Sequence, residues 1–317
     1  MRRRERGVAL VVVMWVSILL TVIASSFIYE ARTDALVVRN TISMARAEGI
    51  ADAAVYRAVF ELYRADNAPD AWRRDGSVRD WTYEGVPVKV EIRDESGKID
   101  VNTAADPLLR GLFQSVGMST EDANNLLDAV LDWRDPDNLK RLNGAEEPEY
   151  RAAGLAYRPA NAPFQAIEEL QLVLGMKPDI YKKLAPFITI YSRQPGINPT
   201  LAPREVLLAI PGVPPQVVDA YIARRDQARA AGEPPPPFPE AGGFTANITP
   251  TASIRAEATL DDGTVFVREA VALLRPTPRR PVTFVAWRES TRPTLGEDQS
   301  EAVAEAKAAA RDREREQ

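Results

Sequence analysis

The sequence predicts an α+β protein in which a long N-terminal helix, transmembrane in its first half and amphipathic in its second, packs on a small antiparallel sheet. A large α-helical domain is inserted into that sheet. Three observations predict this fold class: an uncharged N-terminal stretch, a helical pattern that continues beyond it, and strand patterns that flank a helix-rich middle region. The length of 317 residues suits an anchor and two modest soluble modules.

The composition excludes several kinds of chemistry. The chain has no cysteine and no histidine, which excludes thiolate and histidine catalysis, disulfide frameworks and structural zinc. Any metal must therefore bind through oxygen atoms. The formal net charge of −5 argues weakly against binding to a polyanion.

The uncharged stretch covers residues 8–29 and predicts one membrane-spanning helix. It contains no charged residue and no proline, and at about 1.5 Å per residue it spans a hydrocarbon layer of about 30 Å. The preceding arm, residues 1–7, holds four arginines and one glutamate. Because basic arms stay on the cytoplasmic side, we expect the N-terminus inside and the bulk of the chain outside.

Three interpretations of this segment compete. A cleaved secretory signal is disfavoured, because the apolar stretch exceeds the usual length of about 7 to 15 residues and continues in helical register past Ser26. A plain membrane anchor is the simplest interpretation. The third is a prepilin leader: the basic arm ends in Gly7 and the helix begins at Val8, which resembles type IV prepilins. In such families a prepilin peptidase cuts after that glycine, here between Gly7 and Val8.

The helical pattern does not stop at the membrane. No proline occurs between residues 31 and 63, and apolar residues recur every three or four positions, as one face of a helix requires. They are Ala35, Val38, Ile42, Ala45, Gly49, Ala53, Tyr56 and Phe60. We expect this stripe to lie on the soluble domain and the helix to occupy residues 8–66, since Pro69 follows.

A helix that is membrane-buried first and amphipathic afterwards resembles the start of pilins and pseudopilins. The string GVALVVVMWVSILLTVIASSFIYEARTDALVVRN is similar to the K minor pseudopilins of type II secretion, the GspK family. Most pilins carry a glutamate at the position of Val12, where its carboxylate neutralises the α-ammonium of a neighbouring subunit. A subunit without that carboxylate fits the tip of a filament better than its shaft.

Strand patterns occur in two separated stretches. Residues Val86 to Ile92 alternate between apolar and polar, as a half-buried strand does. Residues Ala252 to Leu274 predict two strands around the hairpin signal Asp261-Asp262-Gly263, and Val282 to Trp287 predicts an edge strand. The resemblance to the K family implies this same arrangement, a pilin-like β-region interrupted by a large helical domain.

These patterns divide the chain into seven expected segments. They are a basic leader (1–7), the long helix (8–66), the first part of the β-region (67–99), the inserted α-helical domain (100–231), a proline-rich linker (232–249), the second part of the β-region (250–290) and a charged tail (291–317).

The inserted region contains a weak internal repeat. The stretch from Ile99 to Asn102 followed by Gly117 corresponds to Ile197-Asn198 followed by Gly212, and each half continues into a helical pattern. We therefore expect two SAM-like or helix-hairpin-helix-like units. Glycine-rich hairpins can bind phosphates through backbone amides, but prolines flank Gly212 and acidic residues stand near both turns. We expect scaffold or protein contact rather than nucleic-acid binding.

An acidic stretch between the two halves is the candidate metal site. Asp135, Asp137, Glu146 and Glu147 could supply the oxygen ligands that calcium prefers. The spacing excludes an EF-hand, and on the residues alone a solvated acidic turn is the simpler interpretation. K pseudopilins carry a similar motif associated with calcium, so the resemblance implies a structural calcium ion. Lys140, Arg141 and Pro148 depart from that pattern.

The sequence thus predicts a structural, non-enzymatic minor pseudopilin. The resemblance implies assembly with I-type and J-type minor pseudopilins at the tip of the pseudopilus, in support of protein export across the outer membrane. It also implies a single-pass location in the bacterial inner membrane, processing by prepilin peptidase with methylation, and contact with secreted cargo or the outer-membrane channel. The alternatives are a membrane-anchored DNA-binding module based on the repeat and a calcium-dependent hydrolase that uses Asp132 or Asp135 with Glu146.

Overall fold

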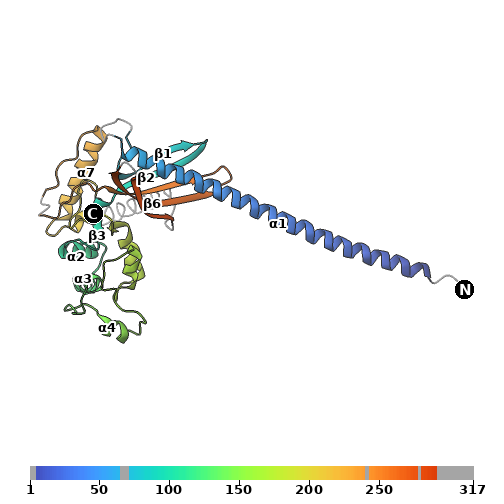
Figure 1. Cartoon of the computed structure of the whole chain (residues 1–317), viewed down its shortest axis with the longest axis horizontal. Coiled ribbons are helices and arrows are strands. Elements are labelled where there is room, and N and C mark those ends of the chain that lie inside the picture. Colours follow the sequence, from blue (N-terminus) through green and yellow to red (C-terminus); the bar gives the residue numbers. More distant parts are fainter. Residues whose placement is uncertain (1–4, 65–70, 240–242, 278–279, 291–317) are drawn as a thin grey trace, which may run out of the picture.

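The protein, described here by a computed structural model, is seen over residues 5–64, 71–239, 243–277 and 280–290. Helix α1 (Glu5–Leu62) projects from the rest of the molecule over its N-terminal half, and its C-terminal half lies on a sheet (Figure 1). Its 58 residues correspond to about 87 Å of helix. The helix ends earlier than the predicted residue 66, and the break expected near Pro69 lies outside the described residues.

In the described part of the chain, five antiparallel strands form the sheet, in the order β1-β2-β5-β6-β7. Their bounds are β1 Asp75–Tyr83, β2 Val86–Asp94, β5 Thr251–Thr259, β6 Val265–Thr277 and β7 Arg280–Glu289. The hairpin expected around Asp261-Asp262-Gly263 is confirmed, because β5 and β6 pair on either side of it. The expected edge strand is confirmed as β7. Strand β1 was not expected, because its sequence does not alternate and most of its side chains are partly or fully exposed.

The chain between β2 and β5 folds into a largely helical insert with its own core. Its elements are η1 Glu95–Gly97, β3 Ile99–Asp100, α2 Asp106–Ser115, α3 Thr120–Arg134, α4 Glu147–Ala152, η2 Ile167–Leu172, α5 Pro178–Leu184, η3 Ala185–Phe187, β4 Ile188–Thr189, α6 Arg204–Leu208 and α7 Pro215–Ala231. Strands β3 and β4 pair in parallel. The buried apolar side chains of the insert form one cluster, and those between α1 and the sheet form another. The insert is therefore a second packing unit.

Two helix pairs occupy the positions of the expected repeat. The first, α2 and α3, turns at Gly117 (φ 99°), and the second, α6 and α7, turns at Gly212 (φ 79°). The pairs approach each other at Gly111 of α2, where an added Cβ would lie only 2.0 Å from the carbonyl oxygen of Ala209. Only glycine fits at that position. The pairs are observed, and their description as SAM-like units stays a prediction.

The face of α1 that packs on the sheet is not the face that the sequence pattern suggested. The buried residues are Ala47, Ile50, Ala51, Ala54, Val55, Ala58, Val59 and Leu62. The predicted stripe lies on the opposite side of the helix, where Ile42, Tyr56 and Phe60 are 64, 57 and 58% exposed. The prediction that this stripe lies on the soluble domain is therefore wrong for most of its length. Tyr56 is the exception, because its ring lies 5.6 Å from that of Phe284 and 5.8 Å from that of Trp287 of β7. Both faces are apolar with helical spacing, so the pattern alone could not choose between them.

The face of α1 opposite the sheet, exposed except at the half-buried Ala53, is named here the outer stripe. It consists of Ala35, Val38, Ile42, Ala45, Gly49, Ala53, Tyr56 and Phe60.

Arg268 of β6 ties α1 to the sheet. Its guanidinium is buried and lies 2.5 Å from Glu48 Oε1 and 2.6 Å from Asp52 Oδ1 of α1. The same group stands 4.9 Å from the ring centre of Phe266 and 5.3 Å from that of Trp287. Because a buried charge is tolerated only when it is paired, this contact fixes the position of the helix on the sheet.

Candidate functional site

The candidate membrane segment is the N-terminal half of α1. Within the described residues, Leu10–Leu62 is the one helix long and apolar enough to cross a membrane, and its most apolar window has a mean hydropathy of 2.5 with none of its residues buried. Single-pass membrane anchoring is consistent with this helix. Gly7 and Val8 lie in the helical backbone that begins at Glu5, whereas residues 1–4 of the leader lie outside the described part. The cut between Gly7 and Val8 stays a prediction.

The acidic stretch forms a cluster where α3 ends and α4 begins. Asp132 is fully buried, and its two carboxylate oxygens accept the backbone N–H of Arg141 at 3.2 and 3.3 Å. The Arg141 side chain lies 3.5 Å from Asp132 Oδ1 and 3.7 Å from Asp135 Oδ2. An added Cβ on Gly144 would lie 1.9 Å from Asp132 Oδ2. The loop therefore closes over Asp132 only because residue 144 is glycine.

Glu146 carries the strongest electrostatic perturbation in this cluster. It is 3% exposed, and neither of its carboxylate oxygens has a hydrogen-bond partner among the described residues. Burial, together with the charges of Asp132, Asp135 and Asp137, raises the pKa of Glu146 to about 7. Burial also raises the pKa values of Asp132 and Asp135, and one buried oxygen of Asp135 lacks a partner. The cluster thus holds negative charge that Arg141 neutralises only in part.

The four predicted ligands do not all face one point. Asp137 is exposed and accepts the backbone N–H of Leu139 at 2.8 Å. Glu147 is bound by Arg151 at 2.5 Å and by Arg158 at 3.6 Å, so its carboxylate is engaged elsewhere. The described residues contain no group of three or more carboxylates arranged to hold a metal ion. A hard cation such as calcium prefers oxygen ligands, and the unpartnered oxygens of Glu146 and Asp135 suit it chemically. The four predicted carboxylates nevertheless do not converge on one point.

Asp132 was missed as a member of this group. On the sequence alone Asp132 is a candidate only in the hydrolase alternative, yet its charge acts on Glu146 and the loop closes over its buried carboxylate. Gly144 was the available signal, because a glycine facing a buried carboxylate marks a close approach of the backbone. Complete burial of Asp132 also keeps it from contact with a substrate, which disfavours its use in hydrolysis.

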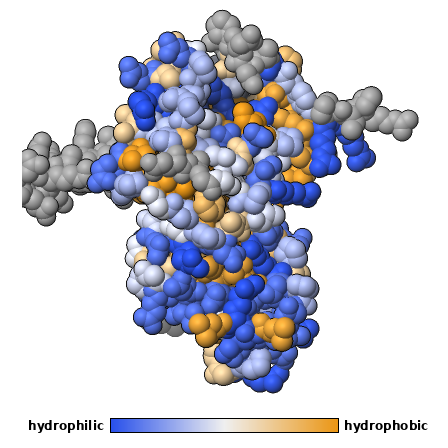
Figure 2. Space-filling model, turned by 90° about the vertical axis from the view of Figure 1, so that its left-hand side faces the viewer, coloured by the Kyte–Doolittle hydropathy of each residue, from blue (hydrophilic) through white to orange (hydrophobic). Residues whose placement is uncertain are grey.

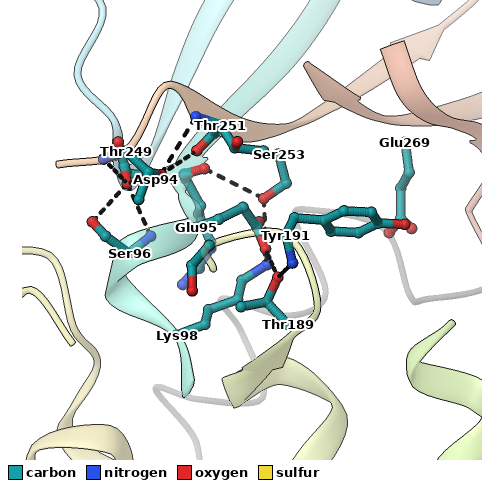
Figure 3. A network of polar contacts seen from close by, with 12 residues as sticks. Asp94, Glu95, Ser96, Lys98, Thr189, Tyr191, Thr249, Thr251, Ser253 and Glu269 are labelled. Atoms are coloured by element: carbon teal, nitrogen blue, oxygen red, sulfur yellow. Dashed lines mark hydrogen bonds and ion pairs between the residues drawn. The ribbon is translucent and has the colours of Figure 1, made fainter. Parts of the chain in front are cut away.

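A buried polar network joins the insert to the sheet at the point where β2 ends (Figure 3). Asp94 accepts hydrogen bonds from Ser96 Oγ at 2.6 Å and from Thr249 Oγ1 at 3.0 Å. Thr249 stands just before β5, where the chain returns from the insert. One carboxylate therefore fastens the entering and returning strands together.

Glu95 extends this network into the insert. It accepts hydrogen bonds from Lys98 Nζ at 2.7 Å and from Thr189 Oγ1 of β4 (Figure 3). Burial alone would raise the pKa of Glu95. The positive charge of Lys98 and the hydrogen bonds have the larger effect, so the pKa of Glu95 lies below its ordinary value. A further contact joins the sheet to the insert, because Arg288 of β7 forms an ion pair with Glu168 of η2 at 2.8 Å. These contacts hold the insert in a defined position on the sheet.

The end of the insert that carries the acidic loop is also hydrophobic at its surface. Leu139 and Leu142 are 78 and 92% exposed, and Figure 2 shows hydrophobic side chains at this lower end among hydrophilic ones. The same loop forms one wall of a groove of about 750 Å³, together with Met118, Leu174 and Ile180. Exposed apolar side chains beside a groove are typical of a protein-contact surface.

The turns of the helix pairs do not form a phosphate-binding surface. The Ser119 hydroxyl already accepts the backbone N–H of Asp122 at the start of α3, and Glu121 and Asp122 stand in its first turn. At the second turn Arg204 is bound to Asp219 at 2.6 Å. The cap at the start of α3 and the carboxylates in both helix pairs disfavour the DNA-binding alternative.

Comparison with known proteins identifies relatives. A family model described as type II secretion system (T2SS), protein K matches residues 90–195. Type II secretion system protein K of Pectobacterium carotovorum is 29% identical over 59% of this chain and 63% of that protein, which is slightly less than two thirds of its length. The protein of the same name from Pseudomonas aeruginosa is 28% identical over 69% of this chain and 73% of its own. The Klebsiella pneumoniae protein is 26% identical over 73 and 77%.

A solved structure shares the fold. A chain in the crystal structure of the GspK-GspI-GspJ complex from enterotoxigenic Escherichia coli matches with a TM-score of 0.57 at 16% sequence identity. The match covers 83% of this chain and all of that one. The α+β arrangement of long helix, antiparallel sheet and further helices is therefore shared with that chain.

Proposed function

Because the chain belongs to the type II secretion system protein K family, we propose that it is a minor pseudopilin that assembles with the I-type and J-type minor pseudopilins. The observation that carries this proposal is a helix of 58 residues, uncharged over residues 8–29, whose C-terminal half packs on a sheet that is interrupted by a large insert. The role is structural, and the assembled tip would support protein export across the outer membrane.

The position of the insert supports a place at the tip of the pseudopilus. It lies beside the C-terminal end of α1, away from the membrane half of the helix (Figure 1). The Asp94 and Glu95 network fixes it there. A body of this size held at that end would occupy the space that a further subunit needs, so the chain would initiate or cap the filament. Val12 is consistent with a position at the tip, because it offers no carboxylate to a subunit above.

The leader and α1 support processing and a defined orientation. Residues 1–7 are basic and residues 8–29 are uncharged, so the N-terminus would lie in the cytoplasm and the sheet and insert in the periplasm, with α1 in the inner membrane. Prepilin peptidase would cut between Gly7 and Val8. The shortened helix would then leave the bilayer and pack among sister helices.

We also propose a structural calcium ion at the acidic loop. Asp135, Asp137 and Glu146 would hold it together with Asp132, whereas Glu147 is held by two arginines. The Arg141 side chain, which is 43% exposed, would leave Asp132 and Asp135 when the cation binds. By neutralising the carboxylates of this loop, the cation would order the neighbouring exposed side chains of Leu139 and Leu142. We propose that these two side chains form the surface that meets secreted cargo or the outer-membrane channel.

Co-purification tests the proposed assembly. The full chain would be tagged at its C-terminus, expressed with its I-type and J-type pseudopilins, and extracted from membranes in mild detergent. We expect all three proteins in one complex. Recovery of the tagged chain alone, under conditions in which the other two proteins are present in the membrane, would contradict the proposal.

A further inference from the structure

The turn that closes over Asp132 contains a pair of residues that is prone to covalent change. Asn143 is followed by Gly144, and this is the one Asn-Gly pair in the 317 residues of the chain. Asparagine is among the chemically labile residues of proteins. A following glycine favours the change, because it has no Cβ to keep its backbone nitrogen away from the asparagine side chain.

The change is loss of the side-chain amide. The backbone nitrogen of Gly144 attacks the side-chain carbonyl carbon of Asn143, and the amide group leaves as ammonia with the proton of that nitrogen. A cyclic succinimide results. Water then opens the ring at either of its carbonyl carbons, which gives aspartate or isoaspartate. The reaction consumes water and needs no oxidant, reductant or enzyme.

In the closed turn both reacting groups are engaged in hydrogen bonds. The side-chain amide of Asn143 donates to Asp128 Oδ2 of α3 at 3.0 Å, and the backbone N–H of Asn143 donates to the same oxygen at 3.0 Å. The attacking nitrogen, that of Gly144, donates to the carbonyl oxygen of Arg141 at 3.1 Å. The reaction therefore requires that these bonds break first.

These bonds lie where local opening is easy. Asn143 is exposed, as are its neighbours Arg141 and Leu142, and the backbone from Asp135 to Glu146 forms no helix or strand. Segments with few buried contacts open at a much lower cost in free energy than the core. The turn therefore opens and closes while α3 stays folded, and the carboxylate of α3 that holds Asn143 acts as its latch.

Neither product fits the closed turn. A carboxylate at position 143 faces the carboxylate of Asp128, so that repulsion replaces attraction. Isoaspartate also lengthens the main chain by a methylene directly before Gly144. That glycine already stands so close to Asp132 Oδ2 that an added Cβ would lie 1.9 Å away. The turn therefore does not close again after the reaction, and the groove loses the wall that Leu142, Asn143 and Gly144 help to form.

We propose that Asn143 is a deamidation site of this protein and that Asp128 sets its rate. The hydrogen bonds to Asp128 keep the amide intact while the turn is closed, and each opening of the turn exposes the amide to attack. The product is a permanently open loop, so the reaction limits the lifetime of the surface that carries Leu142. This inference does not depend on the proposed assembly with sister pseudopilins.

Peptide mass mapping of the full chain tests the site. The protein is kept in detergent and EDTA at pH 8, and electron-transfer fragmentation distinguishes aspartate from isoaspartate. We expect Asn143 to convert to a mixture of the two. Asn138, an exposed asparagine of the same loop that precedes Leu139, is the internal control and should stay an amide.

A sample unfolded in guanidinium chloride gives the rate without the latch, and this rate should be about 10-fold higher than in the folded chain, because opening must first break charge-assisted hydrogen bonds. Equal conversion of Asn143 and Asn138 would overturn the proposal. So would a folded chain with no converted Asn143 at the time when the unfolded sample has converted completely.

Removing the latch tests the control by Asp128. In Asp128→Ala both hydrogen bonds to the carboxylate are lost, so deamidation of Asn143 in the folded chain should approach the unfolded rate, a rise of about 10-fold. Glu121→Ala, which removes an exposed carboxylate from the same helix, is the matched control and should leave the rate unchanged. Hydrogen exchange in peptides from α3 should be the same in both variants. An Asp128→Ala chain that deamidates as slowly as the unaltered chain would overturn the latch.

A mimic of the product tests the consequence for the loop. Asn143→Asp places the deamidated side chain in the turn from the start, and Asn143→Ala removes the amide without adding charge. The backbone N–H of Arg141, which donates to Asp132 in the closed turn, should exchange several-fold faster in the Asn143→Asp chain than in the Asn143→Ala chain. Equal exchange in the two variants would contradict repulsion between position 143 and Asp128.

Discussion

Replacing Glu146 by glutamine should stabilise the insert at pH 8 when no divalent cation is present. The carboxylate is 3% exposed, its two oxygens lack hydrogen-bond partners, and Asp132 and Asp135 add negative charge nearby. A neutral amide at this position removes the buried charge and keeps the shape of the side chain.

The magnitude follows from the pKa of Glu146. Burial raises this pKa from 4.5 to about 7, so the folded state binds the proton more tightly than the unfolded state. Stability is therefore greatest below pH 4.5 and is lost as the pH rises to about 7. At 1.36 kcal/mol for each pH unit, the charged form costs the fold about 3 kcal/mol at pH 8, and Glu146→Gln should recover an amount of that order.

The assay is urea unfolding of the full chain in detergent, followed by pulsed hydrogen exchange in peptides from α3 and α4. In EDTA at pH 8 the variant should unfold at higher urea than the unaltered chain, and at pH 4 the two should coincide. With millimolar calcium the order should reverse, because the cation needs the carboxylate and stabilises only the folded state. Glu121→Gln, on the first turn of α3, is the control and should leave all midpoints unchanged.

Two results would refute this reasoning. One is an unaltered chain whose stability in EDTA rises between pH 5 and pH 7. The other is a Glu146→Gln variant that is equally destabilised in EDTA and in calcium, which would mean that the carboxylate serves the fold through a hydrogen bond.

Three further predictions concern stability and are measured by urea unfolding of the same detergent-extracted protein. Gly111→Ala should destabilise the insert by about 3 kcal/mol, because the new Cβ would lie 2.0 Å from a backbone carbonyl oxygen. The matched change Gly49→Ala, in a helix with open space, should stabilise by about 0.5 to 1 kcal/mol, and equal effects of the two would contradict the packing described here. Arg268→Met should cost about 2 kcal/mol, less than a fully buried pair, because its carboxylate partners on α1 are 48 and 30% exposed and can be hydrated. Tyr150→Phe should destabilise the fold by about 1 kcal/mol, since the hydroxyl accepts a partly buried hydrogen bond from the backbone N–H of Leu174 at 2.9 Å, and an unchanged midpoint would show that this N–H finds another acceptor.

The long helix and the β5–β6 hairpin could be predicted because each depends on a strong local pattern. The helix follows from a proline-free stretch, and the hairpin follows from Asp-Gly between two apolar runs. Strand β1 could not be found in this way. Its pairing with β2 supplies backbone hydrogen bonds to a sequence that has little apolar alternation, so tertiary contacts decide its structure.

The orientation of α1 and the arrangement of the acidic loop depend on contacts that spacing does not encode. Both faces of α1 are apolar, and the sheet is met by the face that carries Ala47, Ala51, Ala54 and Ala58, whose small side chains permit a close approach. Charge counting found the acidic loop, but it could not show that Glu147 turns to two arginines while Asp132 is buried against Gly144. Those outcomes depend on long-range packing.

The most direct test of the proposed role is the mass and N-terminal sequence of the protein extracted from the membranes of its native host. A pseudopilin is processed before it assembles, so we expect a chain that starts at Val8 after removal of residues 1–7, with methylation as an added mass. An intact N-terminus would leave only a plain membrane anchor, and a chain that starts near Ser26 would show a secretory signal. Either result would contradict the assignment of α1 to a filament.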